Sequence, residues 1–426
     1  MKKGIVFSAS LLLARLLPAS AQEEDGRLQA GVKGFIDTYH AIRTASPGDW
    51  MASRSRVRGE LTLEKDNAGM FVSANAVHNS LLKDQSGLFL REAYLYYSKS
   101  GVDIRAGRQI VTWGVADAMR ITDIISPMDF TEFLTQDYDD IRIPVNGVRV
   151  RYTRPKWSAE AIVIPVSSFY ELSTDNANPW AVNLPGVTCP YSVNLDNTPK
   201  KQLKNMEYGG RIGAYLSGVD FNLYALRTWN KMPVFRKTVA ADGSLLCEGE
   251  YRRMTMLGAD LSVPLGKFVI RAEAAEYLGE AQDPVVGTSV ESPVTGYSTA
   301  SAPVVTRNST NALIGVDWYA GNDWQLGLQY SHKYICGDMS GISTFRNAGM
   351  ATVRISKNLL HSTLSLSTFA YVDVANGGIY NRLYADYSLT DQIHALLGYD
   401  FFHADKGQFA MYGRNSEVWI KLKYSF

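Results

Sequence analysis

The last ten residues, 417–426, constrain the fold most strongly because they alternate strictly. Every second residue is apolar, and this row consists of Val418, Ile420, Leu422, Tyr424 and Phe426. A period of two places the apolar row and the mostly polar row between it on opposite faces of a β-strand. Strands of outer-membrane β-barrels have one face against lipid and one against a wet lumen. A terminal aromatic residue on the apolar row favours such a barrel over a soluble sandwich.

The N-terminus has the features of a secretory signal peptide. Two lysines precede a largely apolar stretch, and residues 19–21 match an A-x-A cleavage site. The apolar stretch is too short for a membrane anchor and ends at the cleavage motif. We therefore expect residues 1–21 to be removed and residues 22–426 to form one barrel domain.

The composition fits a membrane barrel. Hydrophobic residues make up 46% of the chain and aromatic residues 11%, yet no later apolar run reaches the roughly 18–20 residues of a spanning helix. A net charge of +1 argues against nucleic acid or another general polyanion as a partner. No linker or low-complexity tract divides the chain into soluble domains.

Alternating segments recur along the whole mature chain and predict an all-β, antiparallel barrel of about eighteen strands. The predicted strands are 28–39, 53–64, 70–80, 88–98, 102–109, 146–153, 157–166, 207–217, 219–229, 251–263, 267–278, 311–320, 323–333, 347–356, 361–373, 378–389, 392–402 and 415–426. Tight turns alternate with long connections, which is the asymmetry of short periplasmic turns and long extracellular loops. Trp157, Trp318 and Trp324 flank tight turns, either as an interfacial girdle or as ordinary cross-strand aromatics.

The sequence predicts neither a catalytic site nor a cofactor or metal site. The six histidines lack ligand spacing, and the three cysteines form no CxxC motif. All three cysteines lie in predicted loops, where an oxidising compartment permits one disulfide, with Cys189 and Cys247 as one pairing.

The connection 110–145 is too long for a hairpin. Ser126-Pro127-Met128-Asp129 has the pattern of a helix N-terminus, so we expect a short helix over 130–136. The segment is rich in acids, among them Asp117, Asp123, Asp129, Asp139 and Asp140.

Strands near this segment direct basic residues into the lumen. Since the apolar phase of each strand faces lipid, the opposite phase must carry the charges, because an arginine on lipid at the midplane costs about 2–4 kcal/mol. The inward basic residues of these strands are Arg54, Arg56, Arg58, Arg105, Arg149 and Arg151.

We expect the 110–145 segment to fold into the lumen and to narrow it, held by these arginines. In one interpretation, opposed acidic and basic walls orient passing solutes; in the other, the ion pairs only hold the segment in place. The candidate lumen residues are Arg54, Arg56, Arg58, Arg105, Arg108, Arg149, Arg151, Asp117, Asp123, Asp129, Asp139 and Asp140.

The same segment carries a family resemblance. Gly107-Arg108-Gln109, Trp113-Gly114, Asp117, Asp123 and Ser126-Pro127-Met128-Asp129 resemble the signature of a porin-like outer-membrane family known only as a domain of unknown function. This family is similar to alginate-export-type barrels of eighteen strands. The resemblance implies a barrel of that size. Some members are encoded beside RND-type exporters and are suspected of exporting lipids or other hydrophobic cargo.

The sequence thus favours a channel in the bacterial outer membrane that passes small polar or charged solutes, or exports cargo with periplasmic partners. The alternative is a surface barrel with a plugged lumen whose long loops bind a ligand or host molecule. Expected partners are outer-membrane lipid and lipopolysaccharide, the barrel-assembly machinery through Phe426, and, for export, a periplasmic or inner-membrane exporter.

Overall fold

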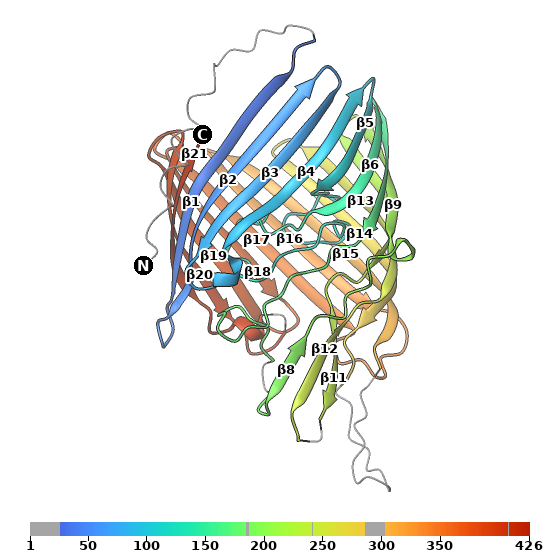
Figure 1. Ribbon diagram of the computed structural model, residues 1–426, viewed down its shortest axis with the longest axis vertical. Coiled ribbons are helices and arrows are strands. Elements are labelled where there is room, and N and C mark those ends of the chain that lie inside the picture. Colours follow the sequence, from blue (N-terminus) through green and yellow to red (C-terminus); the bar gives the residue numbers. More distant parts are fainter. Residues whose placement is uncertain (1–25, 185–186, 241, 286–302, 408) are drawn as a thin grey trace, which may run out of the picture.

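The computed structural model describes residues 26–184, 187–240, 242–285, 303–407 and 409–426. The predicted signal peptide lies outside these residues. An 18-stranded antiparallel sheet closes into a barrel, because β1 (Gln29–Arg43) pairs with β21 (Glu417–Ser425) as well as with β2 (Trp50–Lys65) (Figure 1). The all-β barrel predicted from the alternation is confirmed.

Each predicted segment corresponds to one wall strand. The other wall strands are β3 (Ala68–Asn79), β4 (Gly87–Lys99), β5 (Val102–Gln109), β6 (Val145–Arg154), β7 (Trp157–Val166), β9 (Glu207–Leu216), β10 (Val219–Trp229), β13 (Arg253–Leu265), β14 (Phe268–Gln282), β15 (Val305–Gly321), β16 (Trp324–Ile335), β17 (Asn347–Leu359), β18 (Leu364–Asp373), β19 (Gly378–Ser388) and β20 (Ile393–His403). Several strands, β14 and β15 among them, extend further towards the long loops than predicted.

The barrel exterior is apolar. Leu95, Ile212, Ile314 and Leu397 are about 60% exposed, and each lies on the outward phase of its strand. Such a surface would be unfavourable in water but is matched by hydrocarbon. The closed 18-stranded wall with this exterior places the chain in the bacterial outer membrane.

The seam of the barrel depends on a glycine. Gly34 and Phe426 exchange two backbone hydrogen bonds of 2.9 Å, which extend the pairing of β1 with β21. A Cβ atom on Gly34 would lie 2.6 Å from the Phe426 ring. The terminal aromatic ring thus covers a position that only glycine leaves open.

A second sheet, which the alternation did not predict, lies outside the barrel at the long-loop end. β8 (Tyr191–Asn194), β11 (Val234–Val239) and β12 (Leu245–Glu250) form three strands in the order β11-β12-β8 (Figure 1). Two loops distant in sequence supply them. Cys189, Cys247 and Cys336 are free thiols in this structure.

The short helix predicted over 130–136 is wrong: turns occupy this stretch. Phe133 has a left-handed φ of 49°, and β-bridges join Met128 to Arg142 and Asp129 to Glu171. These bridges take up backbone groups that a helix would have used. Among the residues that the structure describes, helical turns are limited to the short 3-10 turns η2 (Lys83–Gln85), η3 (Leu203–Asn205) and η4 (Ala410–Tyr412). In the described part of the chain, no helix is long and apolar enough to cross a membrane.

Candidate functional site

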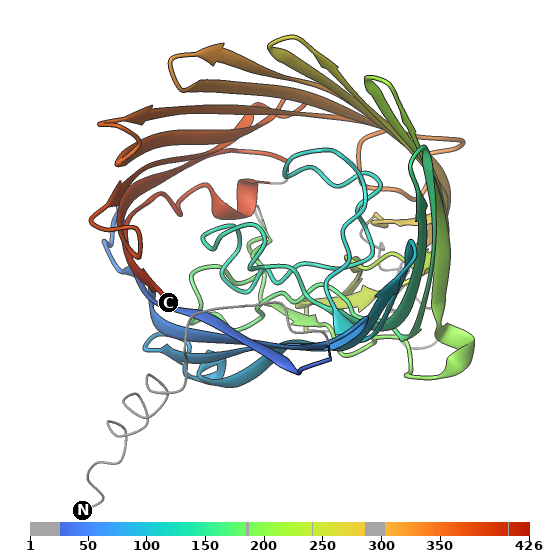
Figure 2. The same ribbon diagram turned by 90° about the horizontal axis from the view of Figure 1, so that it is seen from above.

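The 110–145 segment lies inside the barrel. It leaves the wall after Gln109 and returns at Val145, its pairing partner, so that both ends are adjacent on the wall. Viewed along the barrel, the segment crosses the lumen as a broad loop (Figure 2). Its side chains contact wall strands on several sides of the barrel.

Arginines of β2 hold one end of the segment. Asp140 is ion-paired with Arg56 at 2.9 Å and accepts a hydrogen bond from Arg58 at 2.7 Å, and Arg54 is ion-paired with Glu132. These side chains are about 90% buried or more, so each charge depends on its partner. Burial by itself would raise the pKa of Asp140, but Arg56 and Arg58 hold that pKa well below its ordinary value.

A third acid extends this anchor to the last strand. Asp137 lies 2.8 Å from the ammonium group of Lys421 on β21. The segment therefore bridges β2 and β21, the strands that flank β1 at the seam.

On the opposite side of the barrel, Asp117 of the segment and Glu273 of the wall make the contacts that hold the segment. Asp117 lies 3.2 Å from both Arg271 on β14 and Arg354 on β17. Glu273 on β14 accepts hydrogen bonds from the amides of Val115 at 2.5 Å and Ala116 at 2.7 Å.

Thr122 completes this nest of donors around Glu273, through its amide at 3.2 Å and its hydroxyl at 3.1 Å. Gly114 allows the Glu273 carboxylate to approach the backbone of the segment closely. It has a φ of +84°, and a Cβ there would lie 2.6 Å from the Glu273 carboxylate. Residues of the family signature are thus explained as anchors of the segment.

Trp113 and Asp123, also in that signature, have similar structural roles. The Trp113 indole donates to Glu160 on β7 at 2.8 Å. Asp123 accepts from the Trp113 amide at 3.2 Å and from Arg142 at 2.6 Å. The segment is therefore internally cross-linked by hydrogen bonds as well as attached to the wall.

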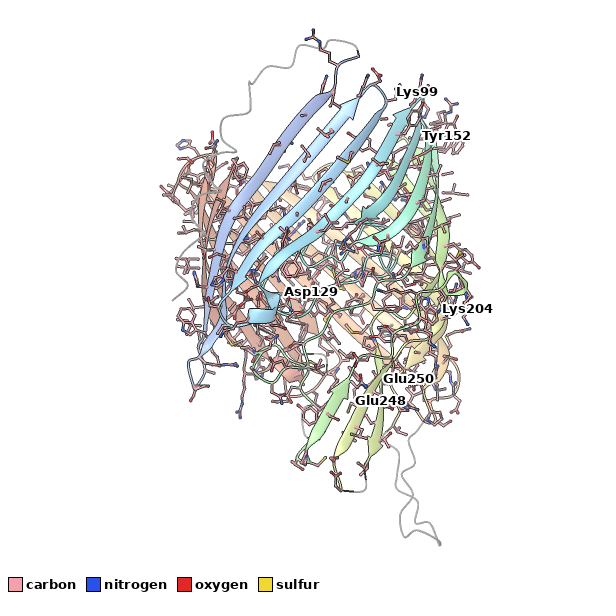
Figure 3. All side chains as sticks on the ribbon, viewed as in Figure 1. Lys99, Asp129, Tyr152, Lys204, Glu248 and Glu250 are labelled. Carbon is pink, nitrogen blue, oxygen red and sulfur yellow. The ribbon has the colours of Figure 1, made fainter. Side chains whose placement is uncertain are left out.

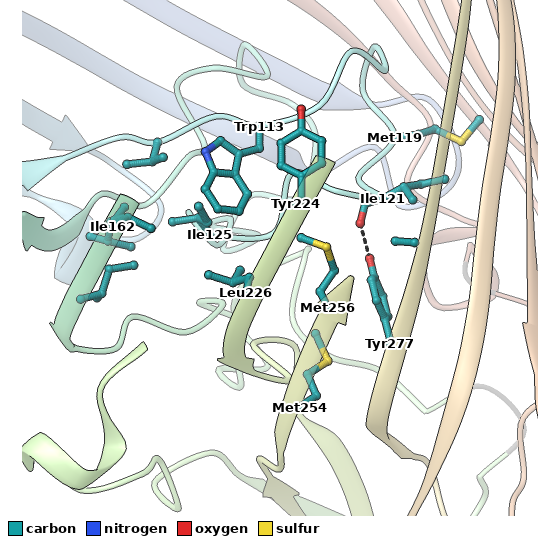
Figure 4. Close-up of a cluster of buried hydrophobic side chains, with 14 of the residues drawn as sticks. Trp113, Met119, Ile121, Ile125, Ile162, Tyr224, Leu226, Met254, Met256 and Tyr277 are labelled. Carbon is teal, nitrogen blue, oxygen red and sulfur yellow. Dashed lines mark hydrogen bonds between the residues drawn. The ribbon is translucent and has the colours of Figure 1, made fainter. Parts of the chain in front are cut away.

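Apolar packing that the alternation pattern did not predict supports the same segment. Figure 4 shows one cluster, in which Trp113, Ile121 and Ile125 pack against inward side chains such as Tyr224 and Leu226. Tyr277 donates to the carbonyl of Ile121 at 2.6 Å. The available signal was local loss of alternation, since Leu223-Tyr224-Ala225-Leu226 on β10 is apolar on both phases.

A second apolar cluster joins this segment to the 167–206 loop. The Phe133 ring lies 4.2 Å from that of Tyr412 and stacks on Trp180 at 5.9 Å, centroid to centroid. Phe402 and Tyr380 of the wall complete the cluster. Trp180 is buried, so this part of the 167–206 loop caps the segment.

Four of the predicted lumen arginines do not hold the segment. Arg105 lies 3.4 Å and Arg149 3.9 Å from Asp103, and Arg151 donates to Tyr215 at 3.0 Å. The Arg105 contact lies within β5, the Arg149 contact joins the neighbouring strands β5 and β6, and Arg151 on β6 reaches past β7 to β9.

Arg108 donates to the carbonyls of Leu90 and Arg91, both at 3.2 Å. The Asp139 side chain is 91% exposed and lies 3.5 Å from Arg142, and the Asp139 carbonyl accepts a hydrogen bond from Arg91 at 2.8 Å. Sequence phase predicts only the side of the wall for Arg105, Arg149 and Arg151, and it does not give the height along the barrel that decides which charges meet.

Asp129 lies beside another acid. It forms a parallel bridge with Glu171, and Figure 3 shows it in the half of the barrel nearer the long loops, away from Lys99 and Tyr152 at the tight-turn end. Part of Glu171 reaches solvent, yet protein surrounds it on most sides. This desolvation, with the nearby charge of Asp129, raises the pKa of Glu171 to about 7.

A cavity of about 470 Å³ remains between the segment and the wall formed by β18 to β21. Its lining includes Tyr138 and Leu134 of the segment and Arg382, Tyr384 and Lys423 of the wall. Within the described ranges, no group of three or more His, Cys, Asp or Glu side chains is placed to hold a metal ion.

Residues 79–277 match a family model described as "Protein of unknown function (DUF1302)", which confirms the family resemblance. A search of curated proteins found no match. Among solved structures, OccK8 (OprE) of Pseudomonas aeruginosa is 8% identical, with a TM-score of 0.53, covering 93% of this chain and 98% of its own. OccAB3 of Acinetobacter baumannii is 10% identical, with a TM-score of 0.50 and coverages of 93% and 99%. The chain therefore has a porin-like barrel fold.

Proposed function

We propose, from the match to the DUF1302 family and from the porin-like barrel, that this protein is an outer-membrane channel for small polar or charged solutes. The 110–145 segment narrows the lumen in this proposal. Its acids and the facing arginines set the local field that a solute meets. No catalytic role is part of the proposal.

The observation that carries the proposal is the cavity of about 470 Å³ beside the segment. A segment that only plugged the barrel would be expected to pack against the whole circumference. The segment does contact β18 to β21, for example through Arg382 and Lys421, but it leaves a space along these strands that charged and polar side chains such as Lys423 and Asp386 line. A polar lining of this kind suits the passage of hydrated solutes.

The test is to replace residues 112–143 with a short Gly/Ser turn. Because Gln109 and Val145 are paired neighbours, a hairpin connection can join β5 to β6 without opening the barrel. We expect single-channel conductance in planar bilayers to rise several-fold over the intact protein. Equal conductance in both would contradict a constriction by this segment.

A surface binding protein with a plugged lumen is the second candidate. It is favoured by the two apolar clusters that fill part of the lumen and by the sheet of β8, β11 and β12 beyond the barrel. A silent bilayer recording from folded, intact protein would support this candidate and reject the channel.

We also propose partners that follow from this location. Lipopolysaccharide would contact the outer leaflet face, and the barrel-assembly machinery would recognise the strand that ends at Phe426. If cargo moves outward, an exporter in the periplasm or inner membrane would dock at the tight-turn end.

A further inference from the structure

We propose that the cavity between the 110–145 segment and β18 to β21 is a binding site for a solute with an aromatic or similarly flat apolar body and one anionic group. This inference rests on the proposed function, since it names the class of solute that the channel would take. It is carried by the chemistry of the cavity lining.

The apolar part of the site is aromatic. Phe369, Tyr371, Tyr384 and Trp419 line the cavity from three different strands, together with Leu396. Tyr384 and Trp419 pack with their ring centroids 6.0 Å apart. Aromatic faces that line a wet lumen are favourably covered by a flat apolar group, because covering them releases water and allows stacking.

Most charges in the lining already have partners. Arg382 lies 3.1 Å from Asp400 and donates to the carbonyls of Leu134 and Thr135. Lys421 lies 2.8 Å from Asp137.

The remaining acid of the lining, Asp386, is held by His394 at 2.9 Å. These groups would fix the shape of the site more than they attract a solute.

Lys423 is different. It has no carboxylate within 4.0 Å among the described residues, and its ammonium group stands over the Phe35 ring at 4.6 Å. Arg56 and Arg58 lie over the same ring, at 4.8 and 4.9 Å. Those two arginines are paired with Asp140, so Lys423 is the cation of the lining left to bind an incoming anion.

The volume limits the solute. About 470 Å³ is within the usual range for small-molecule sites, roughly 300–1,000 Å³. It accommodates a compact aromatic acid and excludes a folded protein. If Lys423 holds the anionic group of the solute, the aromatic ring of the solute would lie towards Tyr384, which lines the same cavity.

The test uses full-length protein refolded in detergent and titrated calorimetrically with four probes. These are phenylacetate, benzyl alcohol, benzylammonium and acetate, which separate the ring from the charge and its sign. We expect phenylacetate to bind and each of the other three to bind at least roughly tenfold more weakly. Equal binding of benzylammonium, or no binding of phenylacetate, would overturn the site.

Two variants assign the site to its residues. We expect Lys423→Gln to weaken phenylacetate binding by roughly five- to tenfold, with recovery in Lys423→Arg. Lys156→Gln, the same change in an exposed periplasmic turn, is the matched control. Tyr384→Ala should weaken phenylacetate without creating affinity for acetate. Unchanged affinity in both Lys423→Gln and Tyr384→Ala would overturn the assignment even if all variants fold.

Bilayer recording distinguishes the two proposals. A barrel that binds phenylacetate but conducts no ions would reject the channel and retain the site. A conducting barrel without phenylacetate affinity would reject the site and retain the channel.

Discussion

Arg58 donates a 2.7 Å hydrogen bond to Asp140, although 82 residues separate them in the chain. The contact joins a wall strand to the far end of the segment in the lumen. Both side chains are about 90% buried or more, so neither charge is well solvated if the other is removed.

Asp140→Asn should destabilise the protein by about 3 kcal/mol, because Arg56 and Arg58 would lose their shared carboxylate. The pKa of Asp140 is lower in the folded protein than in the unfolded chain, where it is about 3.9. The ionised Asp140 therefore contributes to folding stability above about pH 3.9, and this contribution is lost as the pH falls through the pKa of the folded protein. Thermal unfolding in detergent should therefore show a gap between variant and wild type that is full at pH 7 and narrows below about pH 4. A gap independent of pH would refute the charge argument.

Gly114→Ala should loosen the segment through two effects. A φ of +84° disfavours alanine by about 1–2 kcal/mol, and its Cβ would lie 2.5 Å from the Thr122 hydroxyl and 2.6 Å from the Glu273 carboxylate. Gly218→Ala is the matched control, since its φ is +81° but no atom lies within 4 Å of the added Cβ. Limited proteolysis within 110–145 should accelerate for the first variant only. Equally faster proteolysis of both variants would mean that the positive φ alone causes the effect, and not the contacts of the added Cβ with Thr122 and Glu273.

Phe133→Ala removes the ring on which Trp180 and Tyr412 pack. A cavity of this kind costs about 3–5 kcal/mol where the surroundings cannot collapse. We expect larger current fluctuations in bilayer recordings, because the segment and its cap would separate more often. Phe345→Ala, at a side chain 65% exposed, should leave the current unchanged. Recordings without larger current fluctuations in either variant would contradict a role of Phe133 in holding the segment to its cap.

Ion selectivity should depend on pH near neutrality through Glu171. Desolvation and the nearby Asp129 raise the pKa of Glu171 to about 7, so the protonated carboxyl is favoured in the folded protein. The contribution of this protonated carboxyl to folding stability is lost as the pH rises through 7. Above that pH Glu171 adds a second charged carboxylate beside Asp129, and this added negative charge favours cations. The reversal potential in a salt gradient should shift towards cation selectivity between pH 6 and about 8.

Glu171→Gln should abolish that shift, and Asp84→Asn, at an exposed acid of the η2 turn, should retain it. A shift that survives in Glu171→Gln would assign the titration to another group.

Alternation determined the wall of this barrel from sequence alone. Whether Val418 faces lipid and Trp419 the lumen follows from the period of a strand, and the same rule applied to β2 placed Arg54, Arg56 and Arg58 inside. The requirement that lipid-facing positions be apolar made the phase of each strand readable without knowledge of its neighbours.

The tertiary structure decided which inward residues meet. Arg58 reaches Asp140 while Arg149 turns to Asp103, a difference set by height along the barrel and by the path of a loop. The clusters around Trp113 and Phe133, and the sheet of β8, β11 and β12, likewise unite segments distant in sequence. Periodicity is a property of adjacent residues, so it cannot specify contacts whose partners are brought together only when the barrel closes around its own loop.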